Sequence, residues 1–540
     1  MKASILVRAV LVLWLAIGNS LAATQPLGCQ VSLADGIVMG NSRDSSGVLS
    51  FKGIPYATPP VGALRWTPTR PVSPWNDTLD ATQFGHTCWG NFIGAPAPIP
   101  SNEDCLTINV WTGAANNTEK RPVMVWIHGG GFQFGSSAEP VFNGTTIAGQ
   151  GVVLVSFNYR LNVFGFLGLD ELDREGGTPS GNFGLQDMIT ALRWVQTNIA
   201  AFGGDPNHVT VFGQSAGAHS VGLLMSSPIA KEEDLFHQGI MESGAWWDRA
   251  HGSLTTHNEA RQYGLDFVKK LNVTSVSGLR ALSALEINNA QPFSLSQDPG
   301  VTGFAPSIDG YVITAAPGHA FHHGQQMRIP LLAGFTSDEQ YLFEGNALPH
   351  NTSEMFESAA KILFASRLSE FVSLYPDNTS AFLNASSGTL VGDLYVRQQV
   401  WEAAHTHRQT TNMPVFAYYY TYASVYEPIP THTAELPLVF GNLVNNPVIG
   451  SVQPPDDQDR AFSREVMGYW TKFAKTGNPN IPSAAPWPSY GTRGANFLEL
   501  GVSIEPYALQ FLAQYEFISS FREDGVLPLS WRKLQSEFGV

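Results

Sequence analysis

Short runs of β-branched and aromatic residues alternate along the chain with a longer stretch in which apolar residues recur every three or four positions. The short runs predict strands at 122–131, 151–160 and 208–214. The longer stretch, 182–204, predicts a helix that ends near Phe202, because five apolar residues share one face: Leu185, Met188, Ile189, Leu192 and Val195. This order of elements predicts a mostly parallel sheet with helices on both faces.

Two further strands are expected in the second half of the chain, at 329–335 and 415–422, with a mostly helical insertion between them. No internal repeat, low-complexity linker or change of composition divides the chain. We therefore expect an α/β protein with a large, mostly parallel central sheet flanked by helices. Residues 23–540 are expected to form its single domain, with helical insertions.

The first 22 residues have the pattern of a secretory signal peptide. Lys2 and Arg8 precede or border the apolar run 9–17, and small residues lead to a cleavage site after Ala22. The apolar run is shorter than the roughly 20 residues that span a bilayer. The mature chain is therefore expected to be secreted, outside the cell and without stable insertion into a membrane.

Two features of the mature chain fit an extracellular setting. Seven N-x-S/T sequons favour glycosylation, at Asn76, Asn116, Asn143, Asn272, Asn351, Asn378 and Asn384. Only three cysteines are present, so at most one internal disulfide forms and three pairings are possible. Close spacing favours Cys88 with Cys105, which leaves Cys29 as a partly buried free thiol.

The amino-acid composition indicates what kind of molecule the protein binds. Hydrophobic residues make up 43% of the chain and charged residues only 14%, which suits a large globular core. The formal net charge is −15, and no local run of Lys and Arg reverses it. Because such a charge repels phosphate backbones, we expect a small-molecule partner and no binding to nucleic acid.

The candidate chemistry centres on VFGQSAGAHS at 211–220, a G-x-S-x-G motif between an expected strand and the start of a helix. In such an elbow the chain turns so sharply that the residues two before and two after the serine must be small. Gly213 and Gly217 meet this requirement. We therefore predict that Ser215 is a nucleophile and not only a small residue in a tight corner.

A serine nucleophile needs a base and an orienting acid, which follow it in the order acid, then histidine. His432 lies in a loop just after the strand expected at 415–422, where a base belongs. The other candidate histidines fit less well: His128, His219, His350, His405 and His407. The strand at 329–335 leads into TSDEQ, where Asp338 and Glu339 both stay open as the acid.

Donors for an oxyanion are expected from a glycine run, Gly129 to Gly131, which follows the apolar stretch PVMVWIH. Backbone N–H groups of such a loop, with that of the residue after the nucleophile, stabilise the negative oxygen of an acyl-transfer intermediate. The sequence thus predicts acyl transfer through a covalent serine ester, a mechanism that needs no metal or other cofactor.

Several stretches in combination resemble the type B carboxylesterase family, which includes the cholinesterases and fungal lipases and esterases: 51–66, 101–111, 128–136, 159–168, 182–188, 212–217 and 469–480. The resemblance runs from about residue 30 to the C-terminus. It implies an α/β-hydrolase fold and a carboxylic ester hydrolase, and it favours a secreted fungal esterase.

The resemblance also implies roles for single residues. It assigns the acid to Glu339, in the D-E pair after the strand, and the base to His432, eight residues before a Phe-Gly pair. It assigns the oxyanion donors to Gly130, Gly131 and Ala216.

Further positions follow from the same resemblance. The cysteine of the sequence EDC, Cys105, corresponds to one that is bridged to an upstream cysteine, here Cys88. Ser243 and Glu435 resemble positions that support the histidine.

Departures from the family pattern narrow the substrate. Gln214 precedes the nucleophile where cholinesterases have Glu, and Ala95 stands where they have a cation-binding Trp, so a choline ester specialist is not expected. Only 16 residues separate Cys88 from Cys105, too few for the large mobile lid of a triglyceride lipase. We therefore expect an esterase with an open or fixed entrance.

Other interpretations remain to be tested. A secreted lipase or sterol esterase would prefer long-chain emulsions. A cholinesterase-like binding protein would have lost the serine, whereas all three triad positions are filled here. The cluster His319, His322 and His323 suggests a metal site, but its expected loop setting favours a solvated stretch.

Overall fold

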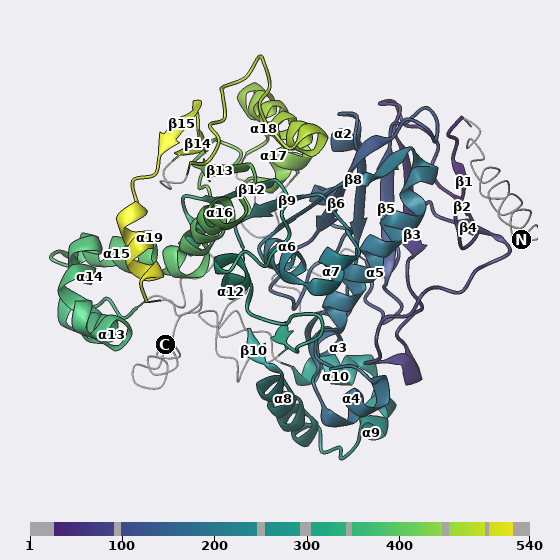
Figure 1. Ribbon diagram of the computed structural model, residues 1–540, viewed down its shortest axis with the longest axis horizontal. Coiled ribbons are helices and arrows are strands. Elements are labelled where there is room, and N and C mark those ends of the chain that lie inside the picture. The colour runs from purple at the N-terminus through teal and green to yellow at the C-terminus, as the bar shows by residue number, and fades with distance from the viewer. Residues whose placement is uncertain are drawn as a thin grey trace, which may run out of the picture.

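One ten-stranded sheet runs through the molecule (Figure 1). The computed structural model describes residues 26–90, 99–245, 254–291, 304–341, 348–444, 453–491 and 496–521. The strands lie in the order β15-β14-β13-β12-β9-β8-β6-β7-β5-β3. Their bounds are β3 Leu49–Pro55, β5 Thr107–Thr112, β6 Arg121–Ile127, β7 Val153–Phe157, β8 Gly204–Gln214, β9 Gln238–Glu242, β12 Leu331–Thr336, β13 Val415–Tyr420, β14 Asn496–Leu500 and β15 Ile504–Ala508.

The strands from β7 across to β14 are parallel, and only the edges are antiparallel, where β3 pairs with β5, β5 with β7, and β14 with β15. Two smaller sheets join β1 (Gln30–Ser32), β2 (Ile37–Met39) and β4 (Thr78–Asp80), and β10 (Thr255–Thr256) with β11 (Ser307–Ile308). The expectation of a large, mostly parallel sheet is confirmed.

Both faces of the sheet are buried, which explains why its strands are almost continuously apolar. Along β6, Val123, Val125 and Ile127 join one hydrophobic cluster, whereas Met124 and Trp126 join a second cluster on the opposite face. Because successive side chains of a strand point to opposite faces, the strand is covered by helices on both sides.

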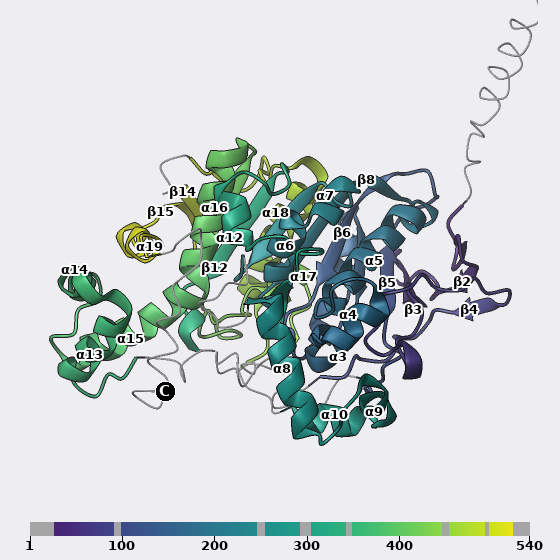
Figure 2. The ribbon, with the colours of Figure 1, turned by 60° about the horizontal axis from the view of Figure 1, so that its bottom comes forward.

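Helices cover the two faces, with α2, α17 and α18 above the sheet and α5 and α6 below it in the view of Figure 1, and Figure 2 shows the same helices from a second side. Helices α5, α6 and α16 contribute to the first cluster, and α2, α17 and α18 to the second. The helices are α2 Thr145–Ala148, α3 Asn162–Phe166, α4 Asp170–Gly176, α5 Phe183–Asn198, α6 Ala216–Ser226, α7 Pro228–Glu232, α8 His257–Lys270, α9 Val276–Ala281, α10 Ala284–Ala290, α12 Pro317–His322, α13 Ser353–Phe364, α14 Leu368–Leu374, α15 Ser380–Gly392, α16 Gln398–Thr411, α17 Leu436–Phe440, α18 Asp457–Thr476 and α19 Leu512–Ser519.

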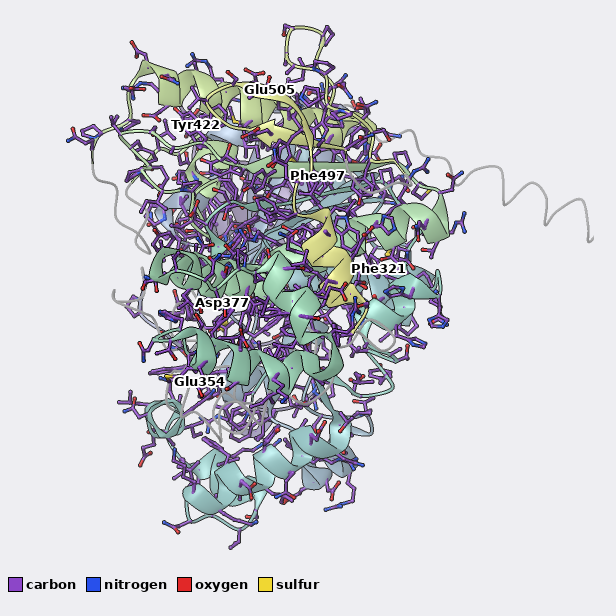
Figure 3. The ribbon with its side chains drawn as sticks, turned by 90° about the vertical axis from the view of Figure 1, so that its left-hand side faces the viewer. Phe321, Glu354, Asp377, Tyr422, Phe497 and Glu505 are labelled. Carbon is purple, nitrogen blue, oxygen red and sulfur yellow. A yellow bond between two sulfur atoms is a disulfide. The ribbon has the colours of Figure 1, made fainter. Side chains whose placement is uncertain are left out.

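The insertion between β12 and β13 is helical, as expected, and consists of α13 to α16. A π-helical turn, Asp393–Arg397, joins α15 to α16. Figure 3 faces this insertion, with Glu354 and Asp377 in it and Phe497 and Glu505 on the neighbouring strands β14 and β15.

The five strands expected from the pattern correspond to β6, β7, β8, β12 and β13. The helix expected at 182–204 is shorter than predicted. It ends at Asn198, and a 3₁₀ turn, Ile199–Phe202, follows before Gly203 adopts a φ of 78° and leads into β8. A left-handed glycine after a helix is a common way to end it.

Candidate active site

Ser215 lies between the end of β8 and the start of α6, in the turn that the motif predicts. Its φ is 56° and its ψ is −124°, values that a residue other than glycine adopts only where the surroundings hold it. A Cβ on Gly217 would fall 2.0 Å from the carbonyl oxygen of Ile127, and one on Gly213 would fall 2.5 Å from the carbonyl carbon of Gly217. Both glycines are therefore required by the close approach of the backbone.

Glu339 and His432 meet at the ends of two neighbouring parallel strands. Glu339 lies in the turn after β12 and His432 in the long loop that follows β13, and the two strands pair from end to end. Oε2 of Glu339 lies 2.5 Å from Nδ1 of His432, while Oε1 accepts a hydrogen bond from the backbone N–H of Thr336 at 2.8 Å. Asp338, the other acid that the sequence left open, instead accepts a bond from the Ser337 hydroxyl at 2.6 Å.

Gln214 connects the histidine to the elbow. Its Nε2 donates to the backbone carbonyl of His432 at 2.5 Å, and the next residue in the chain is Ser215. His432 is thus held through its ring by Glu339 and through its backbone by Gln214. The sequence already singled out Gln214 beside the nucleophile, both for the charge that it lacks and as a residue that supports the site. The bond of Gln214 to His432 spans 218 positions, and no local pattern indicates it.

The other candidate histidines make different contacts. His128 stacks on Tyr159 with ring centroids 4.5 Å apart, and its burial lowers its pKa to about 4. His407 lies on α16, where it bonds to the carbonyl of Ile329 at 2.8 Å and where burial again lowers the pKa to about 4. The three that remain are His405 on α16, His350 in a loop and His219 one turn along α6 from the serine.

The glycine run lies directly against the elbow. A Cβ on Gly129 would fall 3.2 Å from Cβ of Ser215, so the backbone at Gly129 contacts the serine side chain. Gly130 and Gly131 have φ values of 104° and 61°. Ala216 is the first residue of α6, where a helix leaves its backbone N–H without a partner in its own ladder. The three expected donors therefore come from a loop and from the start of a helix, and both border Ser215.

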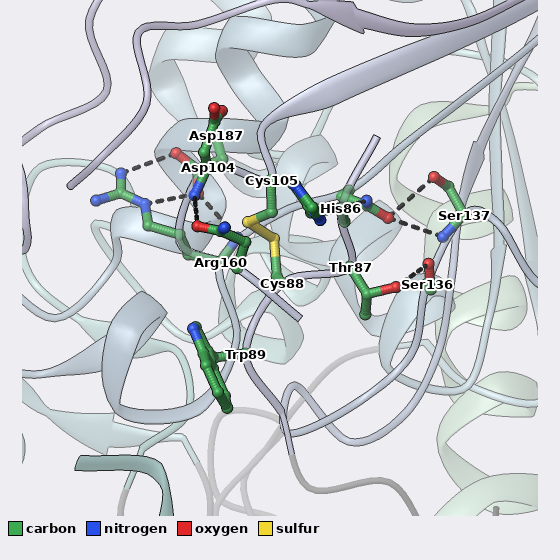
Figure 4. The surroundings of a disulfide bond; sticks show 12 residues. His86, Thr87, Cys88, Trp89, Asp104, Cys105, Ser136, Ser137, Arg160 and Asp187 are labelled. Atoms are coloured by element: carbon green, nitrogen blue, oxygen red, sulfur yellow. Dashed lines mark hydrogen bonds and ion pairs between the residues drawn. A yellow bond between two sulfur atoms is a disulfide. The ribbon is translucent and has the colours of Figure 1, made fainter. Parts of the chain in front are cut away.

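Figure 4 shows the Cys88–Cys105 disulfide with the hydrogen bonds around it, including one from Thr87 to Ser136. Cys88 and Cys105 are bonded, as expected, and Cys29 is free and half-buried. Beside the disulfide, the Thr87 hydroxyl donates to the Ser136 hydroxyl at 3.1 Å, just after the glycine run. A buried hydrogen bond thus joins the segment that carries Cys88 to the residues that follow the glycine run.

Two further buried carboxyl groups, Glu242 and Glu435, lie close to Glu339 and to each other. Burial raises the pKa of Glu242 to about 8, and burial together with Glu242 and Glu339 raises the pKa of Glu435 well above its usual value. Ser243 donates to Oε1 of Glu435 at 3.4 Å, so the two positions that the resemblance singled out do lie together. Glu242, whose Oε1 accepts a bond from Trp470 at 2.8 Å, had no motif to indicate its place here.

The histidine cluster corrects one expectation. His319 and His322 belong to helix α12 and not to a loop, because Pro317 begins a helical turn there. The rings of His319 and His323 stack 4.1 Å apart, and His322 pairs with Glu402 at 3.0 Å. Within the described ranges, no three His, Cys, Asp or Glu side chains are arranged to hold a metal ion.

Some expectations fall outside the described residues, namely the signal peptide at 1–22 and Ala95, which lies between the paired cysteines. In the part of the chain that the structure describes, no helix is both long and apolar enough to cross a bilayer.

Comparison with known proteins gives close relatives over most of the chain. Para-nitrobenzyl esterase of Bacillus subtilis is 35% identical over 495 residues, which cover 87% of this chain and 94% of that protein. Fumonisin B1 esterase of Sphingopyxis macrogoltabida is 35% identical over 459 residues, covering 83% and 82%. Both relatives are bacterial, and the fungal origin stays a prediction.

Solved structures agree with these relatives. A structure titled PNB esterase superposes with a TM-score of 0.78 at 31% identity, covering 91% of this chain and 99% of that one. A carboxylesterase of Geobacillus stearothermophilus gives a TM-score of 0.77 at 31% identity with the same coverage. The sequence profile of the carboxylesterase family matches residues 28–511. The chain therefore belongs to the carboxylesterase family and is a carboxylic ester hydrolase with the α/β-hydrolase fold.

Proposed function

We propose that the chain hydrolyses esters through a triad of Ser215, His432 and Glu339. The observation that carries this proposal is the contact of 2.5 Å between Nδ1 of His432 and Oε2 of Glu339, with His432 also tied by Gln214 to the elbow. A carboxylate on Nδ1 leaves Nε2 as the nitrogen that takes up a proton, which is the arrangement a serine base requires.

In the proposed reaction, Nε2 of His432 takes the proton of the Ser215 hydroxyl while Oγ bonds to the ester carbonyl carbon. The resulting oxyanion accepts hydrogen bonds from the backbone N–H groups of Gly130, Gly131 and Ala216. The histidine then gives its proton to the leaving alcohol, and the acyl group stays on Ser215. In the second half, His432 takes a proton from a water molecule while the water oxygen bonds to the acyl carbon. The histidine then returns the proton to Oγ of Ser215 as the carboxylic acid leaves.

The test compares S215A with S226A on p-nitrophenyl acetate. Ser226 lies at the far end of α6, where its hydroxyl bonds to the Gly222 carbonyl at 2.9 Å, so S226A is a matched control on the same helix. We expect S215A to lose about 10⁴-fold or more in kcat and S226A to keep wild-type activity. A fluorophosphonate should label the peptide that contains Ser215. Full activity of S215A, an inert wild type, or labelling of another serine would overturn the triad.

We further propose small soluble esters as the substrate class. Two relatives are named para-nitrobenzyl esterase and fumonisin B1 esterase, so a para-nitrobenzyl ester and fumonisin B1 are the first substrates to test. Preference for long-chain emulsions, with activation at an oil–water interface, would favour a lipase instead.

Secretion and glycosylation form a separate proposal, in which residues 23–540 are the mature catalytic domain. The Cys88–Cys105 disulfide supports an oxidising compartment. Five sequon asparagines are exposed, at Asn76, Asn272, Asn351, Asn378 and Asn384, and two are half-buried, at Asn116 and Asn143. Expression of the full chain in a secreting eukaryotic host should give medium-borne enzyme that begins at Ala23 and shrinks on treatment with an N-glycosidase. Retention in the cell with an intact N-terminus would contradict this proposal.

A further inference from the structure

The turn that carries Glu339 is also held by Arg397, the last residue of the π-helical turn. Nη1 of Arg397 donates to the backbone carbonyl of Ser337 at 2.8 Å, and Nη2 donates to the carbonyl of Thr389 at 2.7 Å. Nε pairs with Asp393 at 2.8 Å. The side chain is 5% exposed, so its two bonds to carbonyl oxygens are buried and charge-assisted, and bonds of this kind are among the stronger hydrogen bonds in proteins.

The same turn makes two further backbone hydrogen bonds, both to the segment between β13 and His432. The N–H of Ser337 donates to the carbonyl of Tyr420 at 2.9 Å, and the N–H of Asp338 donates to the carbonyl of Pro430 at 3.1 Å. Tyr420 ends β13 and Pro430 lies two residues before His432. These two bonds tie the turn to the segment that leads to His432. Arg397 adds a contact to the same turn from the helical insertion.

The insertion is shaped to receive the guanidinium group. A Cβ on Gly392 would fall 2.7 Å from Nη2 of Arg397, so the glycine leaves the space that the guanidinium occupies. The hydroxyl of Tyr375 donates to Asp393 at 2.7 Å, which helps to fix the carboxylate that pairs with Arg397. The local helix is π-helical, a form that is rare and frequent at functional sites.

We propose that Arg397 is a positioning residue for ester hydrolysis. It fixes the position of the Ser337 peptide, and through it the orientation of the Glu339 carboxylate toward Nδ1 of His432. This inference rests on the triad proposed above. Arg397 touches no reacting atom, so its loss should reduce kcat through misplaced Glu339 and leave the binding of substrate nearly unchanged. A displacement of about 1 Å away from the chemistry can reduce a rate about 10²-fold.

The first test displaces the guanidinium with a single methyl group. G392A places a Cβ against Nη2, at the far end of a long side chain, and alanine is favoured over glycine inside a helix, so the fold should be kept while the guanidinium is displaced. G388A is the matched control, because a Cβ at Gly388, one turn earlier in α15, meets only Cγ of Gln340 at an ordinary 3.6 Å. On p-nitrophenyl acetate we expect G392A to lower kcat about tenfold with KM changed less than about threefold, and G388A to match the wild type. Equal kcat values for the two variants would overturn the proposal.

The second test removes the ion pair as a unit. The double variant D393N/R397M leaves no unpaired buried charge and keeps an acceptor for the Tyr375 hydroxyl. If Arg397 only stabilised the fold, this variant would melt at a lower temperature and keep the kcat of the wild type, measured where both proteins are folded. We expect a melting temperature near that of the wild type but a kcat about 10–100-fold lower.

E339Q, measured beside these variants, separates the two proposals. If E339Q is impaired while G392A and D393N/R397M have wild-type kcat, only the role of Arg397 is overturned. If E339Q itself keeps wild-type kcat, the triad is wrong and the role of Arg397 is overturned with it.

Discussion

The pH dependence of stability tests whether burial raises the pKa of Glu242. Glu242 ends β9 beside the elbow, where its backbone carbonyl accepts a bond from the N–H of Ser215 at 2.9 Å and its Oε1 accepts one from Trp470 at 2.8 Å. Complete burial raises its pKa from 4.5 to about 8. The substitution E242Q keeps an oxygen for Trp470 and removes the proton that titrates.

The size of the effect follows from linkage between protonation and folding. The unfolded chain releases this proton near pH 4.5, whereas the folded chain keeps it until about pH 8. Between these values the folded state holds more protons, so its stability falls as the pH rises. At about 1.4 kcal/mol for each pKa unit, the wild type should lose about 3 kcal/mol between pH 5 and pH 7.5 through Glu242 alone. E242Q should not lose this amount.

The assay is urea unfolding followed by tryptophan fluorescence at both pH values, with reversibility verified at each. E505Q is the matched control, since Glu505 is exposed on β15 (Figure 3), and it should show the pH dependence of the wild type. The reasoning is refuted if E242Q loses as much stability over this interval as the wild type does.

Three further predictions concern Gln214, Gly217 and the disulfide between Cys88 and Cys105. Q214E replaces a donor to the His432 carbonyl by an acceptor, so kcat in steady-state kinetics should fall about tenfold or more, and an unchanged kcat would remove Gln214 from the site. G217A places a Cβ 2.0 Å from the Ile127 carbonyl oxygen, so the free energy of unfolding should fall by about 3 kcal/mol or more, and a wild-type melting temperature would contradict this. C88S/C105S opens a loop with a sequence separation of 17, which should reduce stability to urea by about 3 kcal/mol, whereas an unchanged midpoint would show that the bond is not needed.

Strands with strong apolar runs were predictable, and a strand defined by its neighbours was not. The segments VMVWI and VLVSF read directly as buried strands. β9, with the sequence QGIME, has a glycine and two polar ends, and it is a strand because β8 and β12 pair with it on both sides. Tertiary pairing of this kind leaves little trace in the local sequence.

The candidate site was predictable in proportion to how local its signals are. Ser215 and its glycines lie in one short motif, so their geometry followed from steric rules. The choice between Asp338 and Glu339 needed the family resemblance, because only the shape of the turn decides which carboxyl group reaches the histidine. Arg397 contacts Ser337 across 60 positions and Trp470 contacts Glu242 across 228, so neither contact could be inferred from spacing.

The loop between β13 and His432 is anchored at both ends by the bonds of Tyr420, Pro430 and His432 to the acid turn and to Gln214. Between these anchors, the side chains of Val425 and Ile429 are 53% and 38% exposed. Because the anchors lie outside these two positions, mutations there should not disturb the contact between His432 and Glu339. A saturation library at Val425 and Ile429 should therefore keep a high fraction of active members.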